Sequence, residues 1–350
     1  MSQSGRNDMT AIKSLAFAAA LTPLATLAYG ADFTLRYSTM GSPTAPLFVC
    51  GAQSMMQDLA EASGGRIDFE SYHGGTAFAN PTLQFEQVVR GVTDISQGPL
   101  TYVPGRFALS ELATVPLLVE DNVAGSIAMT RLAQTWLAEE FADIHLLAII
   151  LTTPYQFHMA APLDEFTELE GRRMRVSGPG LTALTEAFGG VPAGMPLPEV
   201  YEAMQRGVID GAIAPWTAVP TFHLDEVAQQ HIQGDLAVGL TFMGMSHQFY
   251  DSLPADLQEL VDTHFSGDAV ARHEAECFQQ IDAQAIAAAQ ERGNEIIVVS
   301  PEDRAAAAER LQPVIERLID EVEATGRPAR DFYEALQAEM ANVSAELAAE

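Results

Sequence analysis

Short β-rich segments alternate with helical segments along most of the chain, and this alternation limits the fold more than any other feature of the sequence. The β-rich segments lie at 34–38, 66–72, 93–97, 145–151 and 173–176. Helices that connect successive strands are typical of parallel sheets with crossover helices. The segment 145–151 (HLLAIIL) is short and almost wholly apolar, as expected of a strand buried on both faces. The pattern therefore predicts an α/β fold.

The second half of the chain also predicts long helices. One helix is expected from 254 to 291, and two more at 301–323 and 330–347. Two segments share the order helix, glycine, strand: 85–95 (FEQVVRGVTDI) and 198–211 (PEVYEAMQRGVIDG). One lies in each half of the chain, so they suggest two similarly built lobes.

The N-terminus has the features of an export signal. Lys13 precedes an uncharged apolar run at 14–28, and Ala28 and Gly30 supply the small residues of a cleavage site before Ala31. A membrane anchor is the alternative, but the run is shorter than the roughly 20 apolar residues of a span, and it contains a proline. We expect residues 1–30 to be removed and the mature protein to be periplasmic; either Met1 or Met9 is the true start.

The charge balance excludes whole classes of partner. The 350 residues include 18 Lys and Arg against 47 Asp and Glu, a formal charge of −29. Binding to nucleic acid or through a polybasic membrane anchor needs clustered basic side chains, which this chain lacks.

Its length predicts about two domains. Cys50 and Cys277 could pair in an oxidising compartment, but the sequence leaves this open.

Arg172, Arg173 and Arg175 form a cluster that stands out in so acidic a chain. Arg175 lies at the C-terminal end of a predicted strand, before a glycine-rich turn and a helix. Ligands of open α/β sheets bind at such strand ends, where helix N-terminal amides favour an anion and arginine can hold a carboxylate with two hydrogen bonds. The alternative is that these arginines pair with nearby surface acids, which we favour for Arg172 and Arg173.

Several segments together resemble one family. They are 169–176 (LEGRRMRV), 198–211, 253–258 (LPADLQ), 102–107 (YVPGRF) and 115–117 (VPL). In order and spacing they resemble the extracytoplasmic solute-binding subunit of tripartite ATP-independent periplasmic (TRAP) transporters, of the DctP type. The resemblance spans the whole mature chain.

The resemblance implies a type II periplasmic-binding-protein fold: two α/β lobes, a ligand cleft between them, and a long helix that bridges both. The first lobe would comprise 31–152 plus about 240–279. The second would comprise 153–239 plus about 280–325, and a C-terminal helix at 326–350 would pack on the lobes.

The resemblance also implies that Arg175 pairs with the carboxylate of the ligand. The chain departs from the family at three places: Tyr155 and Gln156 stand where some members carry a second arginine, 212–216 (AIAPW) replaces a polar stretch, and Ser246 replaces a frequent asparagine. Fewer charges and more apolar surface predict a monocarboxylate with an apolar or aromatic body.

Five further residues are candidates for ligand contacts. Tyr102, Tyr155 and Trp216 could form apolar walls of the cleft, although each could equally belong to the core. Gln97 and His158 could supply polar contacts, with a purely structural role for His158 as the favoured alternative.

The expected function is capture of a small organic acid by hinge closure and its delivery to the TRAP membrane permease, by a monomer that is not an enzyme. We expect no cofactor and no metal, since His273 and Cys277 would supply only two of the three ligands that zinc requires. An exported hydrolase and a ligand-sensing partner of a membrane receptor are the alternatives.

Overall fold

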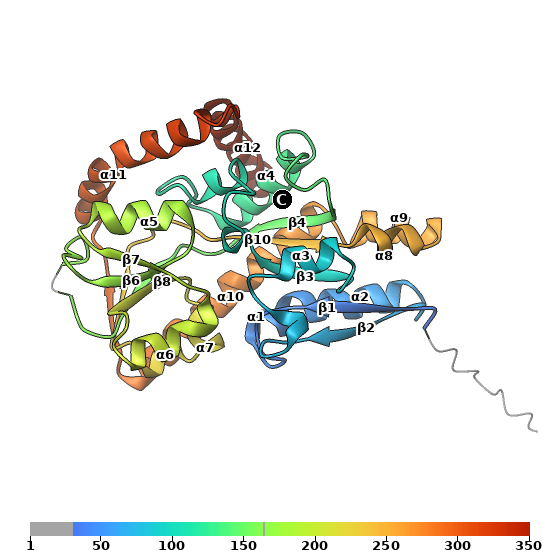
Figure 1. Cartoon of the computed structure of the whole chain (residues 1–350), viewed down its shortest axis with the longest axis horizontal. Helices are drawn as coiled ribbons and strands as arrows, with labels where there is room; N and C mark the ends of the chain where they lie inside the picture. Colours follow the sequence, from blue (N-terminus) through green and yellow to red (C-terminus); the bar gives the residue numbers. More distant parts are fainter. Residues whose placement is uncertain (1–30, 164) are drawn as a thin grey trace, which may run out of the picture. The chain divides into compact units, whose positions relative to one another are not determined.

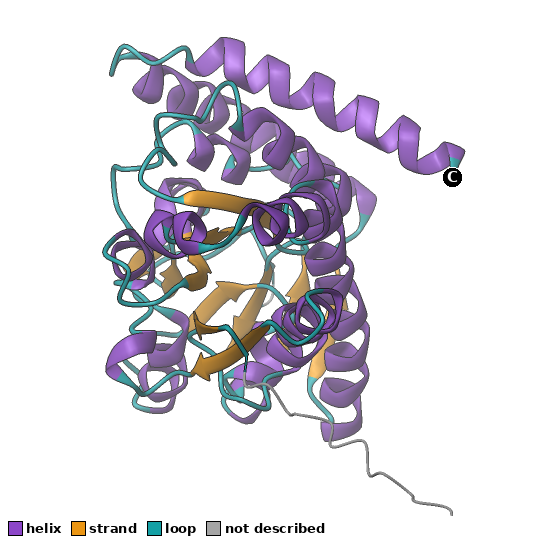
Figure 2. Cartoon of the chain, turned by 90° about the vertical axis from the view of Figure 1, so that its right-hand side faces the viewer, coloured by secondary structure: helices purple, strands orange, loops and turns teal. Residues whose placement is uncertain are grey.

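A computed structural model describes residues 31–163 and 165–350 (Figure 1). The predicted export signal at 1–30 lies outside the described residues. Within them the strands form two sheets, which we call sheet A and sheet B, and helices cover the strands on their outer sides (Figure 2). None of the described helices combines the length and apolar character that a membrane crossing requires.

Sheet A has the strand order β2-β1-β3-β10-β4. Strands β1, β2 and β3 run parallel, whereas β10 is antiparallel to both β3 and β4. The bounds are β1 (Phe33–Ser38), β2 (Ile67–Tyr72), β3 (Ile95–Pro99), β4 (His145–Leu151) and β10 (Leu240–Met245).

Sheet B has the strand order β11-β9-β5-β8-β6-β7. Strand β5 is antiparallel to β8 and β9, and the other neighbours run parallel. The bounds are β5 (Gln156–Met159), β6 (Arg173–Val176), β7 (Val191–Gly194), β8 (Gly211–Ala214), β9 (Gln230–Gln233) and β11 (Glu295–Val298).

The expected parallel pairing is therefore found for most neighbouring strands, but each sheet also contains one strand that is antiparallel to its neighbours. In each sheet the antiparallel strand is the one that the chain enters directly from the other sheet: β5 follows β4, and β10 follows β9. Each of these strands begins where its neighbours end, since Leu240 pairs with Leu151 and Gln156 pairs with Ala214, so it runs in the opposite direction to them. The domain boundaries themselves stay a prediction.

The two connections between the sheets run side by side. The Tyr155 amide donates to the Ala237 carbonyl at 2.7 Å, and the Thr152 amide donates to the Gly239 carbonyl at 3.1 Å. The Thr152 hydroxyl oxygen also accepts from the Gly239 amide at 2.8 Å. These bonds join the two connecting segments that cross between the lobes.

A long helix provides a third link. The expected helix at 254–291 is interrupted, and the structure has α9 (Ala255–His264) and α10 (Asp268–Arg292) instead. Gly267 separates them with φ 70°, a left-handed conformation that glycine adopts without steric cost. Val270 and Ala271 of α10 join the core around sheet A, and Ala285 and Ala289 pack against residues of sheet B (Figure 1).

Shorter helices cover the sheets. The first of the longer ones, α4, ends at Ala133. Asp121 caps its N-terminus by accepting from the amides of Val123 and Ala124. The bounds are α1 (Pro46–Phe48), α2 (Ser54–Ala62), α3 (Gln84–Val89), α4 (Asn122–Ala133), α5 (Gly178–Ala187), α6 (Val200–Gln205), α7 (Ala218–Thr221) and α8 (His247–Ser252).

Two C-terminal helices, α11 (Pro301–Glu323) and α12 (Ala329–Ala349), lie outside the sheets (Figure 2). Helix α11 contacts α5, and α12 packs on α4. The guanidinium of Arg131 on α4 bonds to Glu339 and Glu346 of α12, and the rings of Trp136 and Phe332 lie 6.1 Å apart. The last helix is therefore attached to the sheet A lobe.

Cys50 and Cys277 form a disulfide in the structure, which the sequence left open. Cys50 belongs to a π-helical turn, η1 (Val49–Gln53), and Cys277 lies on α10. The bond joins residues 227 positions apart, so it ties the bridging helix to η1.

We predict that the double variant Cys50→Ala, Cys277→Ala has a free energy of unfolding lower by about 2–5 kcal/mol, because the cross-link restricts a long loop of the unfolded chain. Urea denaturation followed by circular dichroism measures this. Wild-type protein under reducing conditions is the control and should match the variant. An unchanged denaturation midpoint in both samples would contradict the prediction.

Candidate functional site

Strand β6 carries two arginines with different surroundings. Arg173, at the start of the strand, is half-exposed and pairs with Asp210, with 2.8 Å between Nη2 and Oδ1. Arg175, two positions on, is completely buried. The strand ends at Val176, and α5 begins at Gly178, so Arg175 lies close to the C-terminal end of its strand, as the sequence predicts.

Neutral oxygens surround the buried guanidinium of Arg175. Nε donates to the Met195 carbonyl, Nη1 to the Ile213 carbonyl and Nη2 to the Tyr102 hydroxyl, each at 3.0 Å. Among residues 31–163 and 165–350 no carboxylate lies within 4.0 Å of Arg175. An arginine has five N–H donors, so one hydrogen remains on each of Nη1 and Nη2. That is the pair of donors that binds a carboxylate in bidentate fashion.

A small cavity of about 70 Å³ lies between the two sheets, and Arg175 is connected to it through Tyr102 rather than being one of its lining residues. The Tyr102 hydroxyl links the two, because it also accepts from the amide of Leu197, which lines the cavity. The cavity walls are apolar side chains and uncharged polar groups. The lining residues are Thr39, Met40, Gly41, Ala45, Leu47, Phe48, Gln97, Gly98, Pro99, Thr152, Tyr155, Leu197, Pro215, Thr217, Ala218, Thr221, Phe222, Thr241 and Phe278.

Tyr155 is buried and lines the cavity, and its contact with a ligand stays a prediction. Burial raises the pKa of Tyr155 to about 12, and the positive charge of Arg175 acts in the opposite direction. The phenol is thus neutral and within the field of the guanidinium. Gly239 allows this position, since a Cβ there would lie only 2.0 Å from the Tyr155 hydroxyl.

Gln97 forms another part of the wall, and two buried groups hold its amide. Its Oε1 accepts from the Tyr37 hydroxyl at 2.7 Å, and its Nε2 donates to Oε2 of Glu274 at 2.9 Å. Burial raises the pKa of Glu274 to about 7, while the hydrogen bond from Gln97 opposes the shift. Gly51 makes room for this carboxyl group, because a Cβ there would lie 2.6 Å from both carboxyl oxygens.

Of the six predicted site residues, Tyr155 and Gln97 line the cavity, whereas Arg175 and Tyr102 do not line it but are hydrogen-bonded to each other. His158 and Trp216 are fully buried and pack on each other, with ring centroids 5.3 Å apart, and neither lines the cavity. The imidazole of His158 contacts the Nδ1 of His231 at 2.7 Å and the Ala214 carbonyl at 3.1 Å. A ligand contact of these two residues stays a prediction.

Sequence reasoning missed most of the cavity lining. Met40 follows β1, Phe48 belongs to α1, Phe222 follows α7 and Phe278 lies on α10. Their spacing matches ordinary helix and core positions, so only the fold, which gathers them, distinguishes them. The imidazole of His273 has contacts within the fold: its Nε2 lies within hydrogen-bond distance of the Ser54 hydroxyl and the Cys50 carbonyl.

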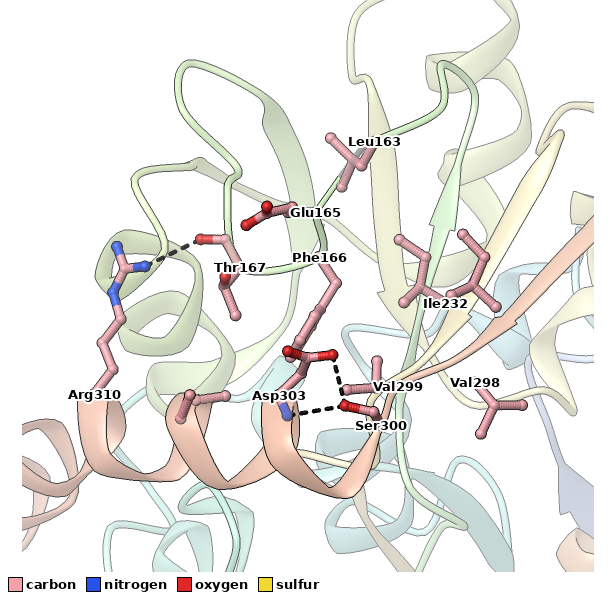
Figure 3. Close-up of a pocket in the computed structure, with 13 residues that line it drawn as sticks. Leu163, Glu165, Phe166, Thr167, Ile232, Val298, Val299, Ser300, Asp303 and Arg310 are labelled. Atoms are coloured by element: carbon pink, nitrogen blue, oxygen red, sulfur yellow. Dashed lines mark hydrogen bonds between the residues drawn. The ribbon is translucent and has the colours of Figure 1, made fainter.

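A larger hollow of about 520 Å³ lies elsewhere, between β11, α11 and the loop that contains Phe166 (Figure 3). Its polar groups serve the fold: Arg310 donates to the Thr167 carbonyl, and Ser300 caps α11 and bonds to Asp303 (Figure 3). The cavity beside Arg175 is therefore the candidate site, since it combines apolar walls with a buried cation that has unused donors.

Two α/β lobes around a small apolar cavity with one buried arginine define a two-lobed ligand-binding protein. Residues 38–321 match the family model of bacterial extracellular solute-binding protein, family 7 (DctP). The chain therefore belongs to this family, and the resemblance seen in the sequence is confirmed.

Known relatives agree in fold and class. The crystal structure of a TRAP solute-binding protein from Rhodoferax ferrireducens, in complex with copurified benzoate, superposes with a TM-score of 0.86. It is 27% identical, over 90% of this chain and 99% of that one, and confirms the predicted fold. A solute-binding protein from Albidiferax ferrireducens is 25% identical over 69% of this chain and 72% of its own. The C4-dicarboxylate-binding periplasmic protein DctP of Rhodobacter capsulatus is 30% identical over 46% of this chain and 48% of its own.

The buried carboxyl of Glu274 predicts a pH-dependent stability. Its pKa is about 7 in the folded protein, against 4.5 ordinarily, so between these values only the folded form holds the proton. The stability that this proton provides is complete below pH 4.5 and is lost as the pH rises through 7. Glutamine has no proton to lose, so Glu274→Gln should escape this loss of stability. The unfolding free energy of the variant minus that of wild type should therefore be higher at pH 8 than at pH 5, by on the order of 3 kcal/mol.

Urea denaturation at the two pH values measures the gain. Glu291→Gln, at an exposed position of the same helix, is the matched control and should show no such gain. A difference between Glu274→Gln and wild type that is the same at both pH values would contradict the prediction.

Proposed function

We propose that the protein is the periplasmic solute-binding subunit of a TRAP transporter, and that it captures a monocarboxylate with an apolar or aromatic body. The observation that carries the proposal is Arg175, a fully buried arginine with two unused N–H groups beside an apolar cavity. Membership of a family of extracellular solute-binding proteins supports a binding role rather than a catalytic one.

The carboxylate would complete the coordination of Arg175. A buried charge without a counter-ion carries a large desolvation cost, and a ligand carboxylate offsets it through two charge-assisted hydrogen bonds. The neutral oxygens of Met195, Ile213 and Tyr102 hold the guanidinium in place, so little side-chain freedom remains to be lost on binding.

The lining of the cavity supports one charge on the ligand rather than two. Its residues include aromatic and aliphatic side chains, threonines and Gln97, and none of the lining residues is charged. A second carboxylate would be buried there without a cation, which is costly. The benzoate bound by the Rhodoferax relative belongs to the class that this lining favours. The dicarboxylate named for the Rhodobacter relative, which shares under half of the chain, represents the competing class.

Capture requires the lobes to separate and close again. The cavity of about 70 Å³ is smaller than the cavity of about 150 Å³ that holds benzene in an engineered protein, so a ring-sized acid needs extra room. The two hydrogen-bonded connections at Thr152 and Gly239 are the natural place for a hinge. We propose that the closed monomer then delivers its ligand to the membrane permease.

We predict that Arg175→Ala weakens binding of the preferred acid by at least about 2 kcal/mol, the scale for truncating one partner of a buried charged pair. Titration calorimetry measures the change. Arg173→Ala is the matched control: it removes an arginine from the same strand, but one that pairs with Asp210 at the surface, and it should bind as wild type does. Near-equal affinity of wild type and Arg175→Ala would remove Arg175 from the site.

We also predict the ranking of ligands. In a thermal-shift and calorimetry panel, benzoate and aliphatic monoacids should stabilise the protein more than succinate, malate or fumarate, because the cavity offers no partner for a second charge. Methyl benzoate, which keeps the ring but loses the charge, is the ligand control and should not bind. Preference for the dicarboxylates would reject the ligand class while leaving the family unchanged.

A further inference from the structure

Tyr102 connects the two lobes through its hydroxyl group. It ends a single 3-10 turn, η3 (Leu100–Tyr102), that directly follows β3 of sheet A. Its hydroxyl oxygen accepts from Nη2 of Arg175 at 3.0 Å and from the Leu197 amide at 2.9 Å. Arg175 lies on β6 of sheet B, and Leu197 follows β7 of the same sheet. One oxygen of the first lobe thus serves two donors of the second.

The surrounding backbone is built for this close approach. Gly178, at the start of α5 on the sheet B side, has φ 82°, and a Cβ there would lie 2.7 Å from Cγ2 of Thr101. Thr101 is the neighbour of Tyr102 in η3. A larger residue at 178 would therefore push the turn that carries Tyr102 away from the second lobe.

We propose that the Tyr102 hydroxyl is a closure latch, a positioning group that couples carboxylate capture by Arg175 to closure of the two lobes. The proposal rests on the ligand-binding role proposed for Arg175. The Met195 and Ile213 carbonyls hold the plane of the guanidinium, and a carboxylate on the free hydrogens of Nη1 and Nη2 reinforces it, so that the remaining Nη2 hydrogen stays directed at the Tyr102 oxygen. The bound acid and the latch therefore favour the same closed form.

Removing the hydroxyl penalises only the closed form. In the closed form of Tyr102→Phe, one hydrogen of Arg175 and the Leu197 amide lose their acceptor inside the protein, whereas in an open form water can satisfy both. Buried donors without a partner are costly, and a change that acts on one of two states shifts their populations. Phenylalanine keeps the aromatic ring of Tyr102, so the variant loses these hydrogen bonds but keeps the packing of the side chain.

The test compares Tyr102→Phe with wild type and with Tyr250→Phe. Tyr250 donates its hydroxyl to Asp262 within the first lobe, neither residue lines the cavity, and Tyr250→Phe is therefore the matched control. Closure is followed by energy transfer between dyes on Thr82→Cys and Glu202→Cys, two exposed positions, one on each lobe. Both native cysteines are engaged in the disulfide and do not compete for the label. Benzoate is the probe ligand.

We expect Tyr102→Phe to release benzoate at least about 10-fold faster, with an association rate within about 2-fold of wild type, because the latch forms after the acid has entered. Its closed fraction at saturating benzoate should fall, while Tyr250→Phe should match wild type. Equal release rates and closed fractions in Tyr102→Phe and wild type would overturn the latch, as would slower release.

The same experiment separates failure of the latch from failure of the proposed function. If wild type binds neither benzoate nor any other monoacid, the proposed ligand class is wrong. The ligand-free proteins still decide the latch in that case, because Tyr102→Phe should then have a lower closed fraction than wild type. An identical closed fraction without ligand would overturn the latch by itself.

Discussion

The candidate site depends on one unbalanced interaction: the buried positive charge of Arg175, whose hydrogen bonds within residues 31–163 and 165–350 all go to neutral oxygens. Carbonyl and hydroxyl dipoles offset part of the cost of removing a guanidinium from water, but they do not neutralise it. The three oxygens come from three separate segments, after β7, on β8 and after β3. Strand order in sheet B and the contact between the lobes are therefore both needed to hold the arginine in place.

The charge of Glu274, which is hydrogen-bonded to Gln97 of the cavity wall, also affects how well the cavity can hold an anion. A charged carboxylate behind Gln97 would repel an anionic ligand in a region of low dielectric, where charges interact strongly. Burial holds the pKa of Glu274 at about 7, so a substantial part of the protein carries this group in its neutral form near neutral pH. The high negative charge of the chain, −29, accordingly says little about the cavity, because charged side chains are absent from its lining.

Much of the fold could be predicted from the sequence because it depends on local signals. Strand and helix alternation gave most elements, and 301–323 was predicted with the bounds that α11 has. The break between α9 and α10 was missed because a single glycine, Gly267, interrupts an otherwise continuous helical pattern. The antiparallel β5 and β10 were missed because strand direction depends on which sheet the chain enters next, and no local pattern encodes that.

The candidate site was predictable only where a residue type is unusual for its surroundings. Arg175 stood out as a cation in an acidic chain, and its strand-end position followed from the pattern. Trp216 and His158 also looked distinctive, yet they pack on each other behind the cavity wall, because large aromatic side chains are as common in cores as in sites. Phe278 is the opposite case. As one apolar residue on a long helix it could not be predicted as a site residue, but α10 bridges the lobes and places it in the cavity lining. Residue chemistry thus identifies the charged anchor of such a site, whereas its apolar walls, and so its choice among acids, come from the topology that gathers them.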